Sequence, residues 1–198
     1  IYWHMVSKLL LAAQECFFMA LENEADEYII DGLKTHYHQI KAGIGLDKNP
    51  EIYGAFPIDA YSHTPGNAGV KQPGLTGQVK EDVISRITEI GISINNGVIN
   101  FNTALLDKNE VSGEKQLFEY YTTGMTKKEI LLDENQLAFT FCQAPIIYSI
   151  TNEEKITIYL DDGKEIHIKG NSLTPEISQD IFNRNGRVER IDYYLKRK

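Results

Sequence analysis

GISINNGVINF, residues 91–101, is the stretch at which the character of this sequence changes. Apolar and polar residues alternate on both sides of Asn96-Gly97, and an Asn-Gly pair between two alternating runs is a strong signal for a tight β-hairpin. Gly91 itself follows a helical pattern and is a suitable helix terminator. The stretch therefore predicts that helical sequence ends here and that a β-rich region begins.

The sequence before Gly91 predicts helices. Apolar residues recur at three- and four-residue steps from about residue 1 to 23, and further apolar groups on the other side of this helix predict packing on more than one face. A second helix is expected over about 25–42, with Gly32 either inside it or ending a shorter one. A third is expected over 79–90, with Thr76 as its N-cap.

The sequence after Gly91 predicts mainly strands, with one short helix that begins at Thr174-Pro175 and ends before Gly186. Residues 107–135 read as a polar connection with some helical tendency. The runs of helices followed by strands predict an α+β chain with a helical domain (1–91) and a β-rich domain (92–198), of which the β unit is antiparallel and sandwich-like. The expected strands are 92–94, 98–101, 137–141, 146–150, 155–160, 165–168 and 188–195.

Composition excludes several classes of protein. A net charge of −8 over 198 residues makes a nucleic-acid partner unlikely, because phosphate binding needs a basic surface. No apolar run is long enough to span a membrane. Cys16 and Cys142 are too few for a disulfide framework and read as buried small hydrophobes. They fit the cytoplasm without excluding export, so the compartment stays open. No cofactor is indicated.

Residues 59–78, DAYSHTPGNAGVKQPGLTGQ, form the strongest candidate site. This long segment is punctuated by Gly and Pro and carries many side chains that can hydrogen-bond a polyhydroxy ligand, whereas most connections are far shorter. His63 either contacts a sugar hydroxyl and moves a proton or is a loop histidine bonded to backbone, and the sequence favours neither. The predicted substrate-binding residues are Asp59, Tyr61, Ser62, His63, Gln72 and Gln78.

Other catalytic arrangements find little support. Ser62 lacks the Gly-x-Ser-x-Gly context of a hydrolase nucleophile. His36 and His38 flank Tyr37 without a carboxylate to complete a metal site, so no metal is predicted. Glycosidic cleavage uses two carboxylates, and Asp59 is the only acid in the polar loop. Glu81 and its neighbour Asp82 fall in the first turns of the next helix, where the helix dipole favours acids in any case.

The order of these segments resembles a known architecture. A packed helix, a Gly-rich polar loop, a helix ending in Gly and then residues 91–102 are similar to the C-terminal end of an (α/α)6-barrel (six-hairpin) glycoside hydrolase or phosphorylase, in which the last barrel helix runs into a β-rich tail. Asn102 holds a position where many members carry Asp or Asn. The resemblance covers most of the chain and is specific from about Tyr61 to Asn102.

The resemblance implies that the chain is the closing part of a carbohydrate-active enzyme. The polar loop would then lie at the mouth of the barrel, with Trp3 and Tyr53 as stacking surfaces and oligosaccharide as substrate. The family's phosphate motifs are absent, which favours hydrolysis over phosphorolysis. Its general acid comes from a helix upstream of the region present here, and no residue of this chain takes that role.

Two other readings remain. In the first, the β unit is a non-catalytic module that binds glycan or protein. In the second, the chain is a purely structural cap. The chain begins at Ile1 with a helical pattern already under way, which predicts that further helices of the same polypeptide precede it.

Overall fold

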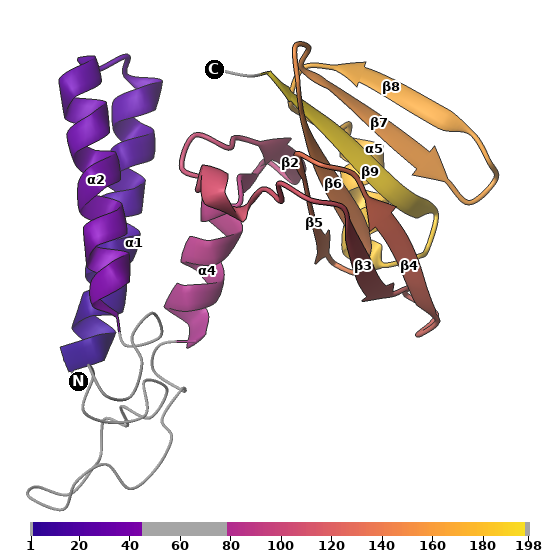
Figure 1. Cartoon of the computed structure of the whole chain (residues 1–198), viewed down its shortest axis with the longest axis horizontal. Helices are drawn as coiled ribbons and strands as arrows, with labels where there is room; N and C mark the ends of the chain where they lie inside the picture. Colours follow the sequence, from indigo (N-terminus) through magenta and orange to yellow (C-terminus); the bar gives the residue numbers. More distant parts are fainter. Residues whose placement is uncertain (1, 45–78, 197–198) are drawn as a thin grey trace, which may run out of the picture. The chain divides into compact units, whose positions relative to one another are not determined.

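The computed structural model describes residues 2–44 and 79–196, which form two compact units, Ile1–Thr88 and Glu89–Lys198 (Figure 1). Helices make up the first unit, and strands with one helix make up the second. The α+β class predicted from the sequence is confirmed.

The first unit contains α1 (Tyr2–Glu22), α2 (Glu27–Gly43) and α4 (Val79–Glu89). The antiparallel α1–α2 hairpin turns at Glu24, whose φ of 50° closes the α1 end. Gly32 lies inside α2, so the longer of the two expected helices is the one that forms. The described core of this unit is small: it centres on Leu10 and Phe17 of α1 and Tyr37 of α2.

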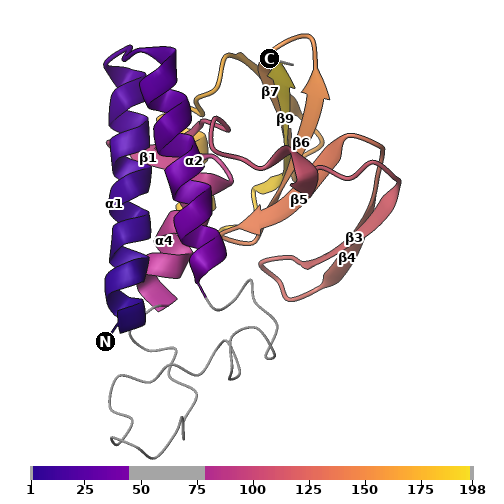
Figure 2. The same ribbon diagram turned by 60° about the vertical axis from the view of Figure 1, so that its left-hand side comes forward.

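The second unit is built on a five-stranded sheet of order β5-β6-β9-β7-β8 (Figure 2). Its strands are β5 (Gln136–Phe141), β6 (Ala144–Thr151), β9 (Val188–Lys196), β7 (Lys155–Leu160) and β8 (Glu165–Lys169). Strands β6 and β9 pair in parallel and the other neighbours are antiparallel, so the sheet is mostly antiparallel, as expected, with one parallel pair. The last strand in the sequence lies at the centre of the sheet.

Two further hairpins complete the second unit. β1 (Ile92–Asn95) and β2 (Val98–Phe101) pair as predicted, and Asn96 and Gly97 both have positive φ, as a type I′ turn requires. β3 (Gln116–Tyr121) and β4 (Lys127–Leu132) form a second hairpin, preceded by the 3₁₀ turn η2 (Lys108–Glu110). The prediction of a polar connection with helical tendency over 107–135 is therefore wrong.

Helix α5 (Pro175–Asn183) packs its apolar face into the core of the second unit. Thr174 caps it by accepting a hydrogen bond from the amide of Ile177, and Pro175 occupies the first turn, as predicted. Ile177 and Ile181 are buried. Helix α5 is also tied to β2, because the amide of Ile99 donates to Ser178 Oγ at 3.1 Å.

Aromatic rings form the centre of that core. Phe101 of β2 stacks on Tyr193 of β9 with ring centroids 4.9 Å apart, and Tyr148 of β6 meets both rings edge-on. Because side chains alternate along a strand, the burial of Ile191 and Tyr193 places Arg190, Asp192 and Tyr194 on the opposite face of the sheet.

Candidate functional site

The predicted sugar-binding residues lie outside the described part of the chain. This holds for Asp59, Tyr61, Ser62, His63, Gln72 and Gln78, for Tyr53, and for the side chain of Trp3, whose backbone belongs to α1. The Thr76 N-cap also lies outside it. Their roles stay predictions.

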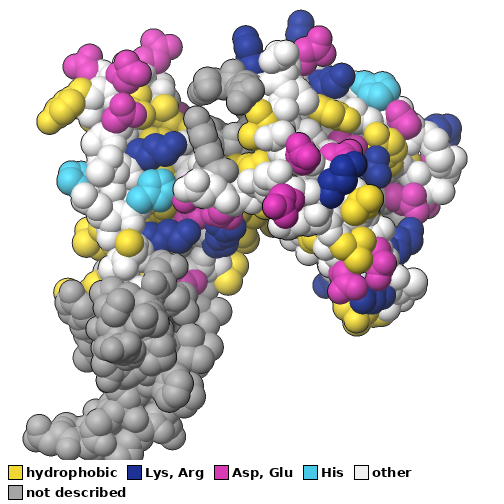
Figure 3. Space-filling view, in the orientation of Figure 1, with side chains coloured by type: hydrophobic (Ala, Val, Ile, Leu, Met, Phe, Trp, Pro, Cys, Tyr) yellow, Lys and Arg dark blue, Asp and Glu magenta, His cyan; other side chains and the backbone are white. Residues whose placement is uncertain are grey.

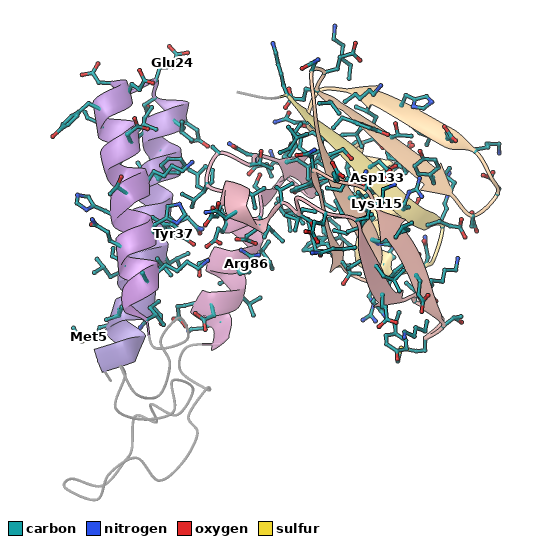
Figure 4. All side chains as sticks on the ribbon, viewed as in Figure 1. Met5, Glu24, Tyr37, Arg86, Lys115 and Asp133 are labelled. Atoms are coloured by element: carbon teal, nitrogen blue, oxygen red, sulfur yellow. The ribbon has the colours of Figure 1, made fainter. Side chains whose placement is uncertain are left out.

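The helical unit buries a layer of polar side chains. Gln14 of α1 is almost wholly buried, and its Nε2 donates to the backbone oxygen of Ser85 on α4 at 2.8 Å. The same nitrogen lies 3.5 Å from the hydroxyl of Tyr37 on α2 (Figure 4). Ser85 Oγ donates in turn to the backbone oxygen of Glu81, one turn earlier on α4. One amide thus links the three helices through hydrogen bonds.

Glu81 carries the least satisfied polar group of this layer. The residue is 4% exposed, and its Oε2 has no hydrogen-bond partner among residues 2–44 and 79–196. Its Oε1 lies 3.9 Å from the exposed Lys80 ammonium, a distant ion pair. A buried polar atom without a partner costs about 1–3 kcal/mol. The sequence explains an acid here by the helix dipole, whereas the structure adds that this acid is buried.

The helical unit exposes apolar side chains on the outer face of α1. Met5, Leu9, Cys16 and Met19, with Ala12 between them, follow steps of four and three residues and are all exposed. We call these five residues the α1 stripe. This face of α1 is exposed in the described structure, and the prediction that Cys16 is buried is wrong. The helical pattern correctly places Cys16 on an apolar face, but that face is the outer one.

The second cysteine also departs from its prediction. Cys142 lies in the turn between β5 and β6, with φ of 49°, and is half-buried rather than enclosed in a strand. Partial burial raises the pKa of its thiol. A raised pKa lowers the thiolate fraction at neutral pH and with it the reactivity of the sulfur.

A second polar cluster lies on the sheet face opposite the aromatic core. Arg190 Nη2 donates to Asp192 Oδ2 at 3.1 Å, and its Nε lies 2.9 Å from Oδ1 in an ion pair. The Arg190 guanidinium lies 4.0 Å from the centre of the Tyr159 ring, and Lys155 Nζ lies 5.0 Å from that of Tyr194. Burial raises the pKa of Asp192, although the charge of Arg190 acts in the opposite direction.

The histidines among the described residues take part in local contacts. His36 Nδ1 lies 3.3 Å from Gln39 Oε1 within α2, and His38 meets the ring of Tyr37 edge-on. His167 Nδ1 lies 3.2 Å from Thr157 Oγ1. Over residues 2–44 and 79–196, no three metal-ligating side chains gather as a metal site requires. No helix in the same ranges is long and apolar enough to cross a membrane.

Comparisons with protein-family models and with curated proteins find no match to this chain. The described residues offer two polar groups that could take part in binding or catalysis. The helical unit offers one buried, incompletely bonded carboxylate, and the sheet offers a polar surface with two tyrosines. The face of β9 has a sequence signal, because Arg190 and Asp192 alternate with Ile191 and Tyr193 in the strand predicted over 188–195.

Proposed function

We propose that this chain is the closing part of a glycoside hydrolase, with α1, α2 and α4 as the last helices of an (α/α)6 toroid and the β unit as its tail. The observation that carries the proposal is the burial pattern of the helical unit. Polar Gln14, Ser85 and Glu81 are inside, whereas apolar Leu9 and Met19 are 56% and 59% exposed.

A buried polar layer and an exposed apolar stripe are both unfavourable in an isolated helical bundle. Burial of apolar surface is the dominant favourable term in folding, and an exposed stripe of large apolar side chains typically marks an interaction surface. In a toroid, neighbouring helices cover such a stripe. The proposed cover is a set of helices from the same polypeptide, upstream of Ile1.

The proposed substrate is an oligosaccharide held by the polar segment 59–78. Aspartate, glutamine, tyrosine and histidine side chains offer both donors and acceptors to sugar hydroxyls, and the segment adjoins α4, whose first turns carry Glu81. The general acid belongs to the upstream helices. Hydrolysis is favoured over phosphorolysis because the phosphate motifs of the phosphorylases are absent from the sequence.

The first experiment is to sequence the DNA upstream of the Ile1 codon and to assay the whole encoded protein against a panel of oligosaccharides. We expect several hundred further codons that encode amphipathic helices, an acidic residue in a polar inter-helix loop, and release of reducing sugar. A start codon immediately upstream would leave too few helices to close a toroid and would overturn the proposal.

The second experiment replaces His63 by alanine in that whole protein. A lost hydrogen bond of about 1–3 kcal/mol predicts a kcat/KM reduced about ten- to hundredfold. His36→Ala is the matched control, because His36 is exposed on α2 and its Nδ1 lies 3.3 Å from Gln39 Oε1 within the same helix. Kinetics of His63→Ala equal to wild type would remove His63 from the site.

A further inference from the structure

The sequence contains two Asn-Gly pairs, and both lie in connections of the β-rich unit. Asn96-Gly97 joins β1 to β2, and Asn185-Gly186 lies between α5 and β9. An Asn-Gly pair is chemically labile, because glycine has no Cβ to hinder attack of its backbone nitrogen on the asparagine side chain. The dipeptides are identical, so a difference in their reactivity has to come from the fold.

The turn at Asn96 leaves the reacting groups accessible. Asn96 and Gly97 are both exposed, and a Cβ placed on Gly97 would meet nothing within 4 Å. Within residues 2–44 and 79–196, the side chain of Asn96 makes no hydrogen bond to another residue. The hairpin pairing next to the turn is between Asn95 and Val98, outside the reactive pair. Water is therefore the neighbour of the Asn96 amide.

The turn at Asn185 holds its side chain at both ends. Asn185 Nδ2 donates to Asp180 Oδ1 at 2.7 Å, and Asn185 Oδ1 accepts from the amide of Arg187 at 3.0 Å. Asp180 is fixed in turn, because its Oδ2 lies 2.8 Å from Arg187 Nη1 in an ion pair. A Cβ placed on Gly186 would lie 3.0 Å from Thr123 Oγ1, so this turn is packed where the other is open. The Asn185 amide has to break two hydrogen bonds before it can turn toward the Gly186 nitrogen.

We propose that Asn96 is a site of spontaneous deamidation in the folded protein, with water as the co-reactant, and that its hydrogen bonds protect Asn185. The Gly97 nitrogen bonds to Asn96 Cγ, and the Cγ–Nδ2 bond breaks. Nδ2 leaves as ammonia, taking the proton of the Gly97 nitrogen. Water then opens the cyclic imide at either of its two carbonyls. One opening gives aspartate, and the other gives isoaspartate, in which the main chain runs through Cγ.

Isoaspartate at position 96 should loosen β1 and leave β2 in place. It adds one carbon to the main chain of a two-residue turn, and the length of the turn fixes the Asn95–Val98 register. β1 pairs only with β2 in the described part of the chain. β2 has a further partner, because the amide of Phe101 donates to the carbonyl of Asn171 at 2.8 Å. The exposed end of β1 is therefore the part that yields.

Deamidation also replaces a neutral amide by a carboxylate. The modified chain is one charge more negative than the −8 of the unmodified chain. Acidic and basic side chains are interspersed over the visible surface of the β-rich unit (Figure 3), and one further exposed charge on such a surface changes stability little. The modified protein therefore stays folded and accumulates as a more acidic species. This inference is independent of the proposed carbohydrate activity.

Incubation of the whole 198-residue chain at neutral pH and physiological temperature tests the proposal. Peptide mapping by mass spectrometry follows each Asn-Gly pair, and an isoaspartyl carboxyl-methyltransferase with labelled S-adenosylmethionine quantifies isoaspartate. We expect Asn96 to deamidate about ten- to hundredfold faster than Asn185, because each of the two hydrogen bonds of Asn185 is worth about three- to tenfold in rate. In guanidinium chloride, where the fold is lost, the two rates should become similar.

Two variants separate the effect of the hydrogen bonds from that of the sequence. Asp180→Ala removes the acceptor of Asn185 Nδ2 and should speed deamidation of Asn185 by about three- to tenfold. Asn96→Gly removes the reacting amide and keeps residues suited to a type I′ turn, so the acidic species should not form. Circular dichroism shows that each variant is folded before its rate is compared.

Three results would overturn the proposal. Equal rates at the two pairs in the folded wild-type chain would show that the hydrogen bonds do not protect Asn185. An unchanged Asn185 rate in folded Asp180→Ala would show the same. No deamidation of Asn96 in the folded chain, while it proceeds in guanidinium chloride, would show that the turn holds the reacting groups apart.

Discussion

The backbone amide of Asn102 donates to the carbonyl of Gly91 at 2.7 Å. This bond lies next to the Ile92–Phe101 pair, at the open end of the β1–β2 hairpin. Gly91 has φ of 96°, and a Cβ at this position would lie 2.9 Å from Asn102 O. Both the backbone conformation and the space therefore require glycine. Gly91 is also the first residue of the 91–102 stretch, which carries part of the resemblance found in the sequence.

Gly91→Ala should destabilise the β-rich unit by about 1–3 kcal/mol, the usual cost of a strained backbone position. Chemical denaturation followed by tyrosine fluorescence measures the change. Gly113→Ala is the matched control in the same unit, since a Cβ there meets nothing within 4 Å. Equal denaturation midpoints for the two variants would show that the residues around Gly91 can move to accommodate the Cβ without a loss of stability.

Leu9 and Leu10 provide a matched pair for the α1 stripe. Leu10 is 3% exposed, so Leu10→Ala should cost about 2–5 kcal/mol, as buried leucine truncations do. Leu9→Ala should change the stability of the 198-residue chain by less than about 0.5 kcal/mol, because its side chain is exposed.

In the longer polypeptide that we propose, Leu9→Ala should cost as much as Leu10→Ala, because upstream helices would cover the stripe. Urea denaturation of the two variants in both lengths of the protein gives the comparison. A negligible effect of Leu9→Ala in the long form would mean that the stripe stays uncovered.

Glu81→Gln separates a functional acid from a structural one. Glutamine removes the charge of a buried carboxylate whose Oε2 has no hydrogen-bond partner among the described residues. We therefore expect the free energy of unfolding to rise by about 1 kcal/mol. Thermal denaturation gives the stability, and the oligosaccharide assay of the whole protein gives the activity. A gain in stability with a loss of activity is the signature of a group retained for function. A loss of stability would instead assign Glu81 to a structural interaction.

The core tyrosines predict alkaline unfolding. Burial raises the pKa of Tyr193, and its hydrogen bond to Glu154 at 2.7 Å acts in the same direction. Burial likewise raises the pKa of Tyr148. Because the folded-state values lie above the unfolded ones, this contribution to stability is complete below the ordinary tyrosine pKa of about 10 and is lost as pH rises above it.

Ultraviolet titration of tyrosinate should therefore show two classes of tyrosine. The class that contains Tyr148 and Tyr193 should ionise only as the β-rich unit unfolds. Tyr193→Phe should move the alkaline unfolding midpoint to higher pH if the loss of the hydrogen bond to Glu154 is small. Ionisation of all tyrosines in one reversible step, without unfolding, would contradict this account.

The sequence predicts the elements that have local signals. Asn96-Gly97 and Asp162-Gly163 specify their hairpins because glycine at these turns adopts positive φ, and Thr174-Pro175 specifies the start of α5. The β3–β4 hairpin is missed because apolar side chains occur on both of its faces. Leu117 and Leu131 stand opposite each other and are exposed, which obscures the alternation.

Pairing between distant strands leaves no local signal. Residues 144–151 and 188–196 contain no local sequence signal for the parallel pairing of β6 with β9, because this pairing depends on how the intervening elements cross over. The burial of Glu81 cannot be predicted from the sequence either, because an acid in the first turn of a helix is ordinarily solvated. The Lys115–Asp133 ion pair that links the start of β3 to the end of β4 is likewise a product of the fold (Figure 4).

The central place of β9 has a consequence for biosynthesis. Its neighbours β6 and β7 are both translated before it, and each lacks its second partner until residues 188–196 leave the ribosome, although β6 can already pair with β5 and β7 can pair with β8 once β8 is made. Until then two apolar strands present open edges, which are templates for aggregation. The nascent β-rich unit is therefore a natural client for chaperones, and a premature stop codon that removes β9 divides the sheet into the separate β5–β6 and β7–β8 hairpins.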